Sequence, residues 1–306
     1  VENKPALAWD QCMVMFDVQD EFGALPDYIN DVESVWNFCK PPIHGWALQR
    51  LLERTDAITG EHLAEAYGPL CRWTDWWLSY RDADGDGLPE YHHGNDSGWD
   101  NSTVFAHGVP VQSPDLAAFL VYQMDVLADV AARLGRCAEA NHWRERADDL
   151  LAKMLAAFWR GDHFVARHVH THEVIPSESL LLFLPIVLGK RLPDDVIRHM
   201  VAGLKQANRL TPHGLATEPT DSPYYQPDGY WRGPIWAPST MLIVDGLNAV
   251  GETALAQDLS RRFCAMAARS GMAENFDALT GEGLRDRAYS WTSSVFLLLA
   301  RDTLSN

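Results

Sequence analysis

The feature of this sequence that most restricts its fold is a succession of amphipathic helical segments joined by connections of alternating length. Apolar residues recur at helical spacing along nearly the whole chain, which predicts an all-α protein. Gly135 and Gly251 follow two of the segments and are typical helix stops. We expect ten helices, at 6–19, 43–55, 62–80, 114–134, 138–159, 177–188, 194–207, 238–250, 252–269 and 288–304.

The long connections between these helices are expected to lie at one end of the protein. In a row of antiparallel helices, every second connection lies at the same end, and loops longer than about 12 residues are usually functional. Most of the loop aromatics and clustered acids also fall in the long connections, so we predict a binding face there. The long connections are 20–40, 81–112, 160–175, 208–237 and 270–287, and the short ones are 56–61, 135–137, 189–193 and 251.

A closed ring of helical hairpins, the (α/α)6 toroid, would cover the apolar faces of all these helices. Such a ring needs twelve helices, and this chain begins on a segment that we take as an outer helix without its inner partner. We therefore predict a single toroid domain over 1–306 that lacks roughly one N-terminal hairpin, in keeping with a first residue, Val1, that is not a natural start. The alternative, an open helical array, has no repeat of fixed period to support it.

Composition narrows the classes of partner. The net charge of −17 argues against nucleic acid and against an anionic membrane surface, because both need a basic face. No apolar run reaches the roughly 18 residues that span a bilayer, and nothing in the sequence indicates an oligomeric state.

The cysteines show no CxxC spacing, which favours buried thiols in a reducing compartment and hence a cytoplasmic protein. They are Cys12, Cys39, Cys71, Cys137 and Cys264.

Residues 94–102 form the most informative loop of the chain. They read Gly-Asn-Asp-Ser-Gly-Trp-Asp-Asn-Ser, so two carboxylates, two amides and two hydroxyls surround one tryptophan. Trp99 offers a flat apolar face and Asp100 beside it offers a proton. This combination suits a sugar ring with an acid aimed at its glycosidic oxygen, and several of the chain's twelve tryptophans lie in such polar loops.

Three segments resemble the signatures of the inverting α-glycosidases related to processing glucosidase I and trehalase. Residues 94–102, with Ser-Pro-Asp-Leu at 113–116, resemble the general-acid loop of that group. Tyr-Trp-Arg-Gly-Pro-Ile-Trp at 230–236 resembles the second signature. Glu-Asn-Phe-Asp at 274–277, with Thr280-Gly281 and Ser-Trp-Thr at 290–292, resembles the third.

The segment before the second predicted helix departs from the trehalase pattern. Lys40 precedes Pro41 and Pro42, where trehalases have a glutamine. Bacterial glucosidase-like members, including those that act on glucosylglycerate or mannosylglycerate, are closer to this chain. The resemblance thus implies hydrolysis of an α-linked glucoside or a similar small glycoside, with inversion and without a catalytic cofactor.

Inversion requires one carboxylic acid that protonates the leaving oxygen and one carboxylate that activates water, roughly 6.5–9.5 Å apart. By resemblance, Asp100 is the general acid and Glu274 the general base. They stand on two long connections of the same predicted face, so they can confront one another. The local rivals are Asp96 and Asp277, which we expect to accept hydrogen bonds from the backbone of their own turns.

The predicted sugar site is lined by aromatic and polar side chains of the same loops. Arg232 is expected to hold a hydroxyl or a substrate carboxylate, or else to form a structural ion pair with an acid on a neighbouring loop. Asn95 and Gln112 are candidate binders of sugar hydroxyls. The aromatic walls, for which core packing is the alternative, are Trp99, Tyr230, Trp231, Trp236 and Trp291.

A weaker pattern concerns a cation. Asp82, Asp84 and Asp86 match the first half of an EF-hand calcium loop, and Glu90 could add a ligand. A histidine stands where the usual final glutamate is expected, so a polar turn is favoured over a Ca²⁺ site. The alternating histidines at 168–172 could bind a metal, although an exposed strand explains them more simply.

Two other functions remain open for such a chain. A sugar isomerase or epimerase on the same toroid would use histidine acid–base pairs in place of opposed carboxylates. An inactive sugar-binding protein would keep the aromatic loops without catalysis.

Overall fold

The computed structural model describes residues 4–304, which divide into two compact units. The first unit comprises the residues up to 100 together with 109–157 and 168–172. The second unit comprises 101–108, 158–167 and the residues from 173 onward. A single domain over 1–306 stays a prediction.

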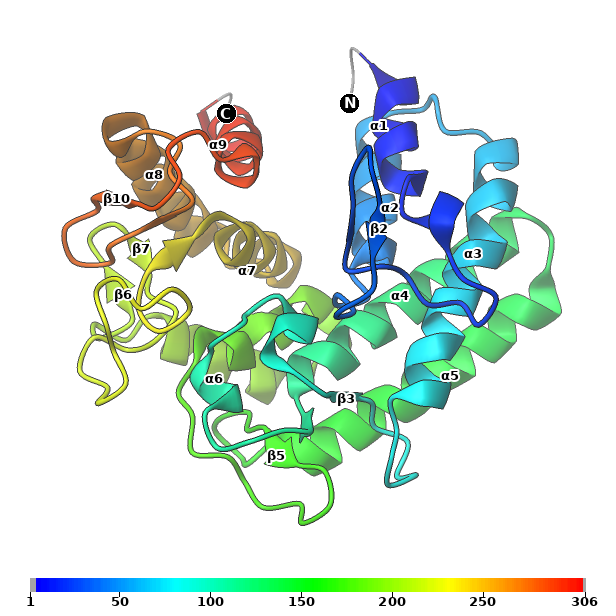
Figure 1. Cartoon of the computed structure of the whole chain (residues 1–306), viewed down its shortest axis with the longest axis horizontal. Coiled ribbons are helices and arrows are strands. Elements are labelled where there is room, and N and C mark those ends of the chain that lie inside the picture. Colours follow the sequence, from blue (N-terminus) through cyan, green and yellow to red (C-terminus); the bar gives the residue numbers. More distant parts are fainter. Residues whose placement is uncertain (1–3, 305–306) are drawn as a thin grey trace. The chain divides into compact units, whose positions relative to one another are not determined.

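The first unit is built around one buried helix, α4. Its helices are α1 (Pro5–Met13), α2 (His44–Arg54), α3 (Gly60–Tyr80), α4 (Pro114–Arg133) and nearly all of α5 (Cys137–Phe158). Both α2 and α3 pack against α4, as Figure 1 shows. The apolar side chains on all sides of α4 form the core of this unit.

The Gln123 side chain joins these three helices. It accepts a hydrogen bond from the Gly45 amide of α2 at 3.0 Å and donates one to the Thr74 hydroxyl of α3 at 2.9 Å. A Cβ at Gly45 would lie 2.6 Å from the Cα of Gln123, so only glycine allows this approach. The amide is fully buried and is satisfied by both partners.

The second unit is centred on α7 (Ala237–Val250). The helices α8 (Thr253–Ser270) and α9 (Ser290–Leu304) pack on α7, and the 3₁₀ segment η4 (Leu180–Arg191) covers another side. Figure 1 shows α7, α8 and α9 side by side. Helix α6 (Asp194–Leu204) packs on η4.

Two of the predicted helices differ from expectation. The segment predicted as an α-helix at 177–188 is 3₁₀, because Pro185 lacks an N–H and Gly189 has a φ of 55°. Its backbone approaches α7 so closely that a Cβ at Gly246 would lie 2.6 Å from the Ile186 carbonyl oxygen. The first helix ends at Met13 and is followed by the short 3₁₀ segment η1 (Phe16–Val18). The other predicted helices are confirmed, and none in the described part of the chain is long and apolar enough to cross a bilayer.

The long connections contain two-residue strands and 3₁₀ turns. In the first unit the antiparallel pairs are β1 (Tyr28–Ile29) with β2 (Ser34–Val35) and β3 (Glu90–Tyr91) with β4 (Val111–Gln112). In the second unit β6 (Leu210–Thr211) pairs with β7 (Gly214–Leu215), and β9 (Asn275–Phe276) lies between β8 (Ile235–Trp236) and β10 (Gly283–Leu284). The remaining 3₁₀ turns are η2 (Gly94–Ser97) and η3 (Thr103–Phe105).

The strand that was predicted for the alternating histidines is short. Strand β5 (Arg167–His168), at the boundary of the two units, includes only the first of them. His172 has a φ of 56°, and this left-handed conformation is incompatible with an extended strand.

Asp115 links the first turn of α4 to β3. Its carboxyl group is fully buried and accepts hydrogen bonds from the Tyr91 hydroxyl at 2.8 Å and from the Ser113 hydroxyl. Burial raises the pKa of Asp115 from 3.8 to about 6, although both hydrogen bonds act to lower it.

We predict that Asp115 makes the protein less stable as the pH rises. Because the folded state holds the proton more tightly than the unfolded chain, the stabilisation is complete below pH 3.8 and is lost as the pH rises through about 6. Asp115→Asn removes this titration. Urea unfolding between pH 4 and 7 should show the wild type losing up to about 3 kcal/mol relative to the variant. Parallel stability curves would contradict this assignment.

Candidate functional site

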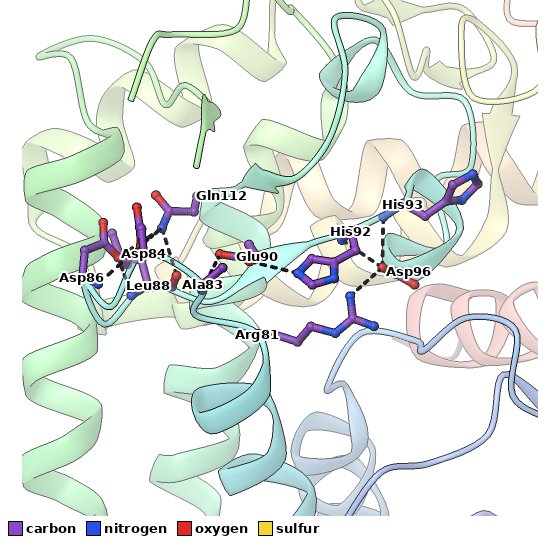
Figure 2. A network of polar contacts seen from close by, with 10 residues as sticks. All are labelled: Arg81, Ala83, Asp84, Asp86, Leu88, Glu90, His92, His93, Asp96 and Gln112. Atoms are coloured by element: carbon purple, nitrogen blue, oxygen red, sulfur yellow. Dashed lines mark hydrogen bonds and ion pairs between the residues drawn. The ribbon is translucent and has the colours of Figure 1, made fainter. Parts of the chain in front are cut away.

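The conformation of the loop that ends at Asp100 is held by the carboxylate of Asp96. This carboxylate is buried and accepts hydrogen bonds from the backbone amides of His92 and His93, both at 3.0 Å, and of Cys39 at 3.2 Å. Arg81 adds an ion pair at 3.2 Å. Figure 2 shows Arg81 and the two histidine amides converging on Asp96. The prediction that Asp96 binds backbone amides is confirmed, and its oxygens are occupied by these contacts.

The segment at Lys40 supports the same loop. Lys40 donates a hydrogen bond to the Asn95 carbonyl oxygen at 3.0 Å and forms an ion pair with Asp27 at 2.8 Å. The side-chain amide of Asn95 makes no hydrogen bond to the described residues. Its predicted contact with a sugar hydroxyl stays a prediction.

Asp100 follows a buried tryptophan. Trp99 is 5 % exposed, and its amide donates to the Ser97 hydroxyl at 3.0 Å. Gly98, with a φ of 72°, allows the bend before it. The Asp100 side chain is half-buried, and within residues 4–304 its carboxylate forms neither a hydrogen bond nor an ion pair. In contrast to Asp96, it is available to a ligand.

The residue after Asp100 fixes the loop that carries the second signature. The Asn101 side chain donates to the Gly229 carbonyl oxygen and accepts from the Trp231 amide, both at 3.0 Å. Its own carbonyl oxygen accepts a hydrogen bond from Nε of Arg232 at 2.7 Å. All four residues belong to the second unit. Asn101 was not among the predicted site residues, and its position directly after the predicted acid was the signal that could have indicated it.

Arg232 is oriented by this contact and not by an acid. No carboxylate in the described part of the chain pairs with it, so the structural ion pair considered as an alternative does not form there. Its terminal nitrogens, Nη1 and Nη2, have no acceptor among those residues either. The half-buried guanidinium is thus held at one edge, and the other edge can bind an anion.

The predicted aromatic walls fall into two groups. Trp231 and Trp236 stack face to face with ring centroids 4.0 Å apart, and only 2 % and 1 % of their surfaces are exposed. Trp236 also donates to the Tyr230 carbonyl oxygen at 2.8 Å. Tyr230 is half-buried, and Trp291, whose ring centroid lies 6.3 Å from that of Trp236, is 48 % exposed. Contacts of these rings with sugar stay a prediction.

Glu274 lies just before β9 in the second unit. Its amide donates to the Asp286 carbonyl oxygen at 2.7 Å, and its side chain is only 9 % exposed. The carboxylate has no hydrogen-bond or ion-pair partner among residues 4–304. Asp277, by contrast, accepts from the amides of Leu279 and Thr280, both at 2.8 Å, as predicted for a turn cap.

The acidic loop at 82–87 is a hydrogen-bonded turn that also occupies Gln112. The Gly87 amide donates to Asp82 at 3.0 Å, and the fully buried Gln112 amide donates to Asp86 at 3.1 Å and to the Leu88 carbonyl oxygen at 3.0 Å. Figure 2 shows Gln112 pointing into this loop. Its predicted contact with a sugar hydroxyl stays a prediction, but its side-chain nitrogen already donates hydrogen bonds to the loop.

Glu90 also takes part in this turn, and His172, which is distant in sequence, contacts two acids of the turn. The Glu90 carboxylate accepts from the Ala83 amide at 3.2 Å and contacts His92 at 2.9 Å. His172 lies 2.8 Å from Asp84 and 3.7 Å from Asp86. One ligand atom from each of these last three residues lies within 4.8 Å of the others. A calcium ion in this loop stays a prediction.

Comparison with known proteins gives consistent matches. The family model described as the mannosylglycerate hydrolase MGH1-like glycoside hydrolase domain matches residues 2–292. A mannosylglycerate hydrolase of Thermus thermophilus is 35 % identical over 86 residues, which cover 28 % of this chain and 20 % of that protein. A glucosylglycerate hydrolase of Mycolicibacterium hassiacum is 24 % identical over 336 residues, covering 84 % of this chain and 74 % of that protein.

A solved structure extends the likeness to the fold. A GH63 mannosylglycerate hydrolase of Thermus thermophilus in complex with Tris and D-glycerate superposes with a TM-score of 0.86 at 20 % identity, over 98 % of this chain and 90 % of that one. This match confirms the predicted all-α fold class, the (α/α)6 toroid.

We predict that Asn101→Ala destabilises the second unit. The substitution removes the side-chain hydrogen bonds to the buried Trp231 amide and to the Gly229 carbonyl, which keeps only the Arg232 amide as a donor, and this loss costs about 2 kcal/mol. Urea unfolding measures this loss. The matched control is Asn248→Ala, at an exposed position of α7, which should change the free energy of unfolding by less than about 0.5 kcal/mol. Equal effects of the two variants would show that Asn101 does not anchor the loop.

Proposed function

Because the chain belongs to the family of MGH1-like glycoside hydrolases, we propose that it hydrolyses an α-linked glycoside of glycerate with inversion at the anomeric carbon. The observation that carries the choice of substrate is the guanidinium of Arg232, which Asn101 holds at one edge. Glycerate glycosides bear a carboxylate in the leaving group, and arginine binds carboxylates with two parallel hydrogen bonds.

In the proposed reaction Asp100 donates its proton to the glycosidic oxygen, so glycerate leaves as the alcohol. Glu274 takes a proton from a water molecule whose oxygen attacks the anomeric carbon from the opposite face. The products are glycerate and a sugar with inverted configuration. Both carboxylates lack partners among the described residues, whereas those of Asp96 and Asp277 are occupied by backbone amides. This difference supports the choice of acid and base.

The sugar ring is proposed to contact the aromatic side chains of the same loops. Trp291 has the largest exposed face, and Tyr230 is fixed by the Arg285 guanidinium, 4.9 Å from its ring centroid. The buried rings of Trp231 and Trp236 lie against Tyr230, and that of Trp236 also lies near Trp291.

All cysteines are free thiols, which supports a reducing cytoplasm as the place of action.

We predict that the wild type hydrolyses glucosylglycerate or mannosylglycerate and that Asp100→Asn and Glu274→Gln each lower kcat by about a thousandfold or more. Each substitution removes a group that transfers a proton in the transition state. Release of glycerate measures the rate on the glycerate glycosides, and release of glucose measures it on aryl α-glucoside and trehalose as comparison substrates. The matched control is Asp277→Asn, which keeps an acceptor for the turn and should retain activity. Wild-type rates in either catalytic variant would contradict the assignment.

The stereochemistry is a separate prediction. Proton NMR during the first minutes of hydrolysis should detect the β-anomer of the released sugar before mutarotation sets in. First formation of the α-anomer would contradict inversion. Binding of these glycosides without release of any product would favour the inactive sugar-binding protein, and an altered sugar without glycerate release would favour the isomerase or epimerase.

Arg232 should determine the preference for acidic glycosides. We predict that Arg232→Met raises KM for glucosylglycerate by about tenfold or more and leaves KM for neutral glucosylglycerol nearly unchanged, because only the first substrate has the carboxylate. Arg232→Lys should give an intermediate value, since lysine cannot reproduce the planar contact. Equal losses on both substrates would assign Arg232 to loop structure alone.

A further inference from the structure

A second arginine lines a cavity that the proposed reaction does not use. The cavity has a volume of about 470 Å³ and lies entirely within the second unit. Its walls are residues 162–164, residues 177–178, the beginning of η4, the C-terminal half of α6, Gln206 and Arg209. The cavity thus lies beside two elements that pack on each other, α6 and η4.

Arg209 is the most unusual group in this cavity. It is 3 % exposed, and only Nη2 has an acceptor, the Glu178 carbonyl oxygen at 2.7 Å. Its Nε and Nη1 have no hydrogen-bond partner among the described residues. The guanidinium lies over the Phe183 ring, 4.7 Å from the centroid. Buried donors normally have acceptors. Two of the three guanidinium nitrogens of Arg209 have none among the described residues, and no carboxylate there forms an ion pair with it.

The acids nearby do not supply that partner. Glu218 is buried, but its two oxygens accept hydrogen bonds from the hydroxyls of Thr103 and Ser222. Asp221 accepts from the Asn208 amide. Burial lowers the pKa of Arg209 to about 10, so the side chain still carries its positive charge at neutral pH.

The other walls suit a small organic body. Phe164, Leu182, Phe183 and Met200 are apolar. His163 and His199 each use Nδ1, the first with Asp162 and the second with the Asp195 carbonyl oxygen. Their Nε2 atoms, like the side-chain amide of Gln206, make no hydrogen bond with residues 4–304 and can serve a ligand.

We propose that this cavity binds a small organic monocarboxylate, whose carboxylate group pairs with the Arg209 guanidinium and whose body lies against Phe183 and Met200. The exposed side chains of Asp162 and Glu178 also line the cavity, and their negative charge disfavours a dianion such as phosphate. A monocarboxylate is also less strongly hydrated and so enters an apolar cavity at lower cost. This binding is independent of the proposed hydrolysis, because neither Asp100 nor Glu274 lines the cavity.

Isothermal titration of the whole chain with benzoate tests the proposal, with inorganic phosphate as the second probe. The wild type should bind one benzoate, and Arg209→Met should weaken that binding by tenfold or more. Ala202→Trp, which fills the cavity from an exposed position of α6, should do the same without removing Arg209. The matched control is Arg198→Met, also on α6 but outside the cavity, and it should bind like the wild type.

The outcomes separate this proposal from the proposed function. All three variants should keep the wild-type rate of glycoside hydrolysis. Arg209-dependent binding of phosphate in preference to benzoate would overturn the ligand class. Benzoate binding that neither Arg209→Met nor Ala202→Trp weakens would overturn the site, as would no benzoate binding to the wild type. If Arg209→Met does not fold, Ala202→Trp alone decides.

Discussion

The proposed active-site loop depends on one buried carboxylate. The carboxylate of Asp96 accepts hydrogen bonds from three backbone amides and pairs with the guanidinium of Arg81. Burying a charged group is costly unless hydrogen bonds and an opposite charge compensate for the lost water. Cys39 and Arg81 lie outside the loop, 57 and 15 residues before Asp96. By joining them, Asp96 sets the backbone path on which Trp99 and Asp100 stand. Its carboxylate therefore holds the fold of the loop, whereas the carboxylate of Asp100 has no partner among the described residues and is available to a ligand.

A similar division of roles recurs in the second unit. Asn101 satisfies Gly229, Trp231 and Arg232 through its side chain and carbonyl oxygen. Arg232 keeps two nitrogens without acceptors in the described chain as a consequence. Near β9 one acid, Asp277, caps its turn, while Glu274 stays nearly buried and unpaired there. In each case the groups without partners are those to which the proposed function assigns a role.

Much of the fold could be predicted because helical periodicity is a local signal. The exception at 180–191 arises from Pro185 and from the left-handed backbone of Gly189, and the spacing of apolar residues reports neither effect. The roles of Asp96 and Asp277 were also predictable, since turn acids bind neighbouring amides. Such contacts join residues only a few positions apart, so a short stretch of sequence is enough to predict them.

Contacts between distant segments could not be predicted in this way. His172 reaches Asp84 across 88 residues of sequence, and Gln112 is drawn into the same acidic loop. Asn101 pairs with residues about 130 positions away. Whether a tryptophan faces sugar or another tryptophan is likewise a matter of packing, as the stacked Trp231 and Trp236 show. Sequence patterns indicated candidate loops but not which side chains within them are occupied by other residues of the protein.

The central claim, that Glu274 activates water on the face opposite the leaving group, has a direct chemical test. Glu274→Ala should be inactive on glucosylglycerate in buffer alone, and added azide should restore release of glycerate by entering the space of the missing carboxylate. The product expected from inversion is the β-glucosyl azide, identified by NMR. An α-glucosyl azide, or full activity of the variant without azide, would contradict the account.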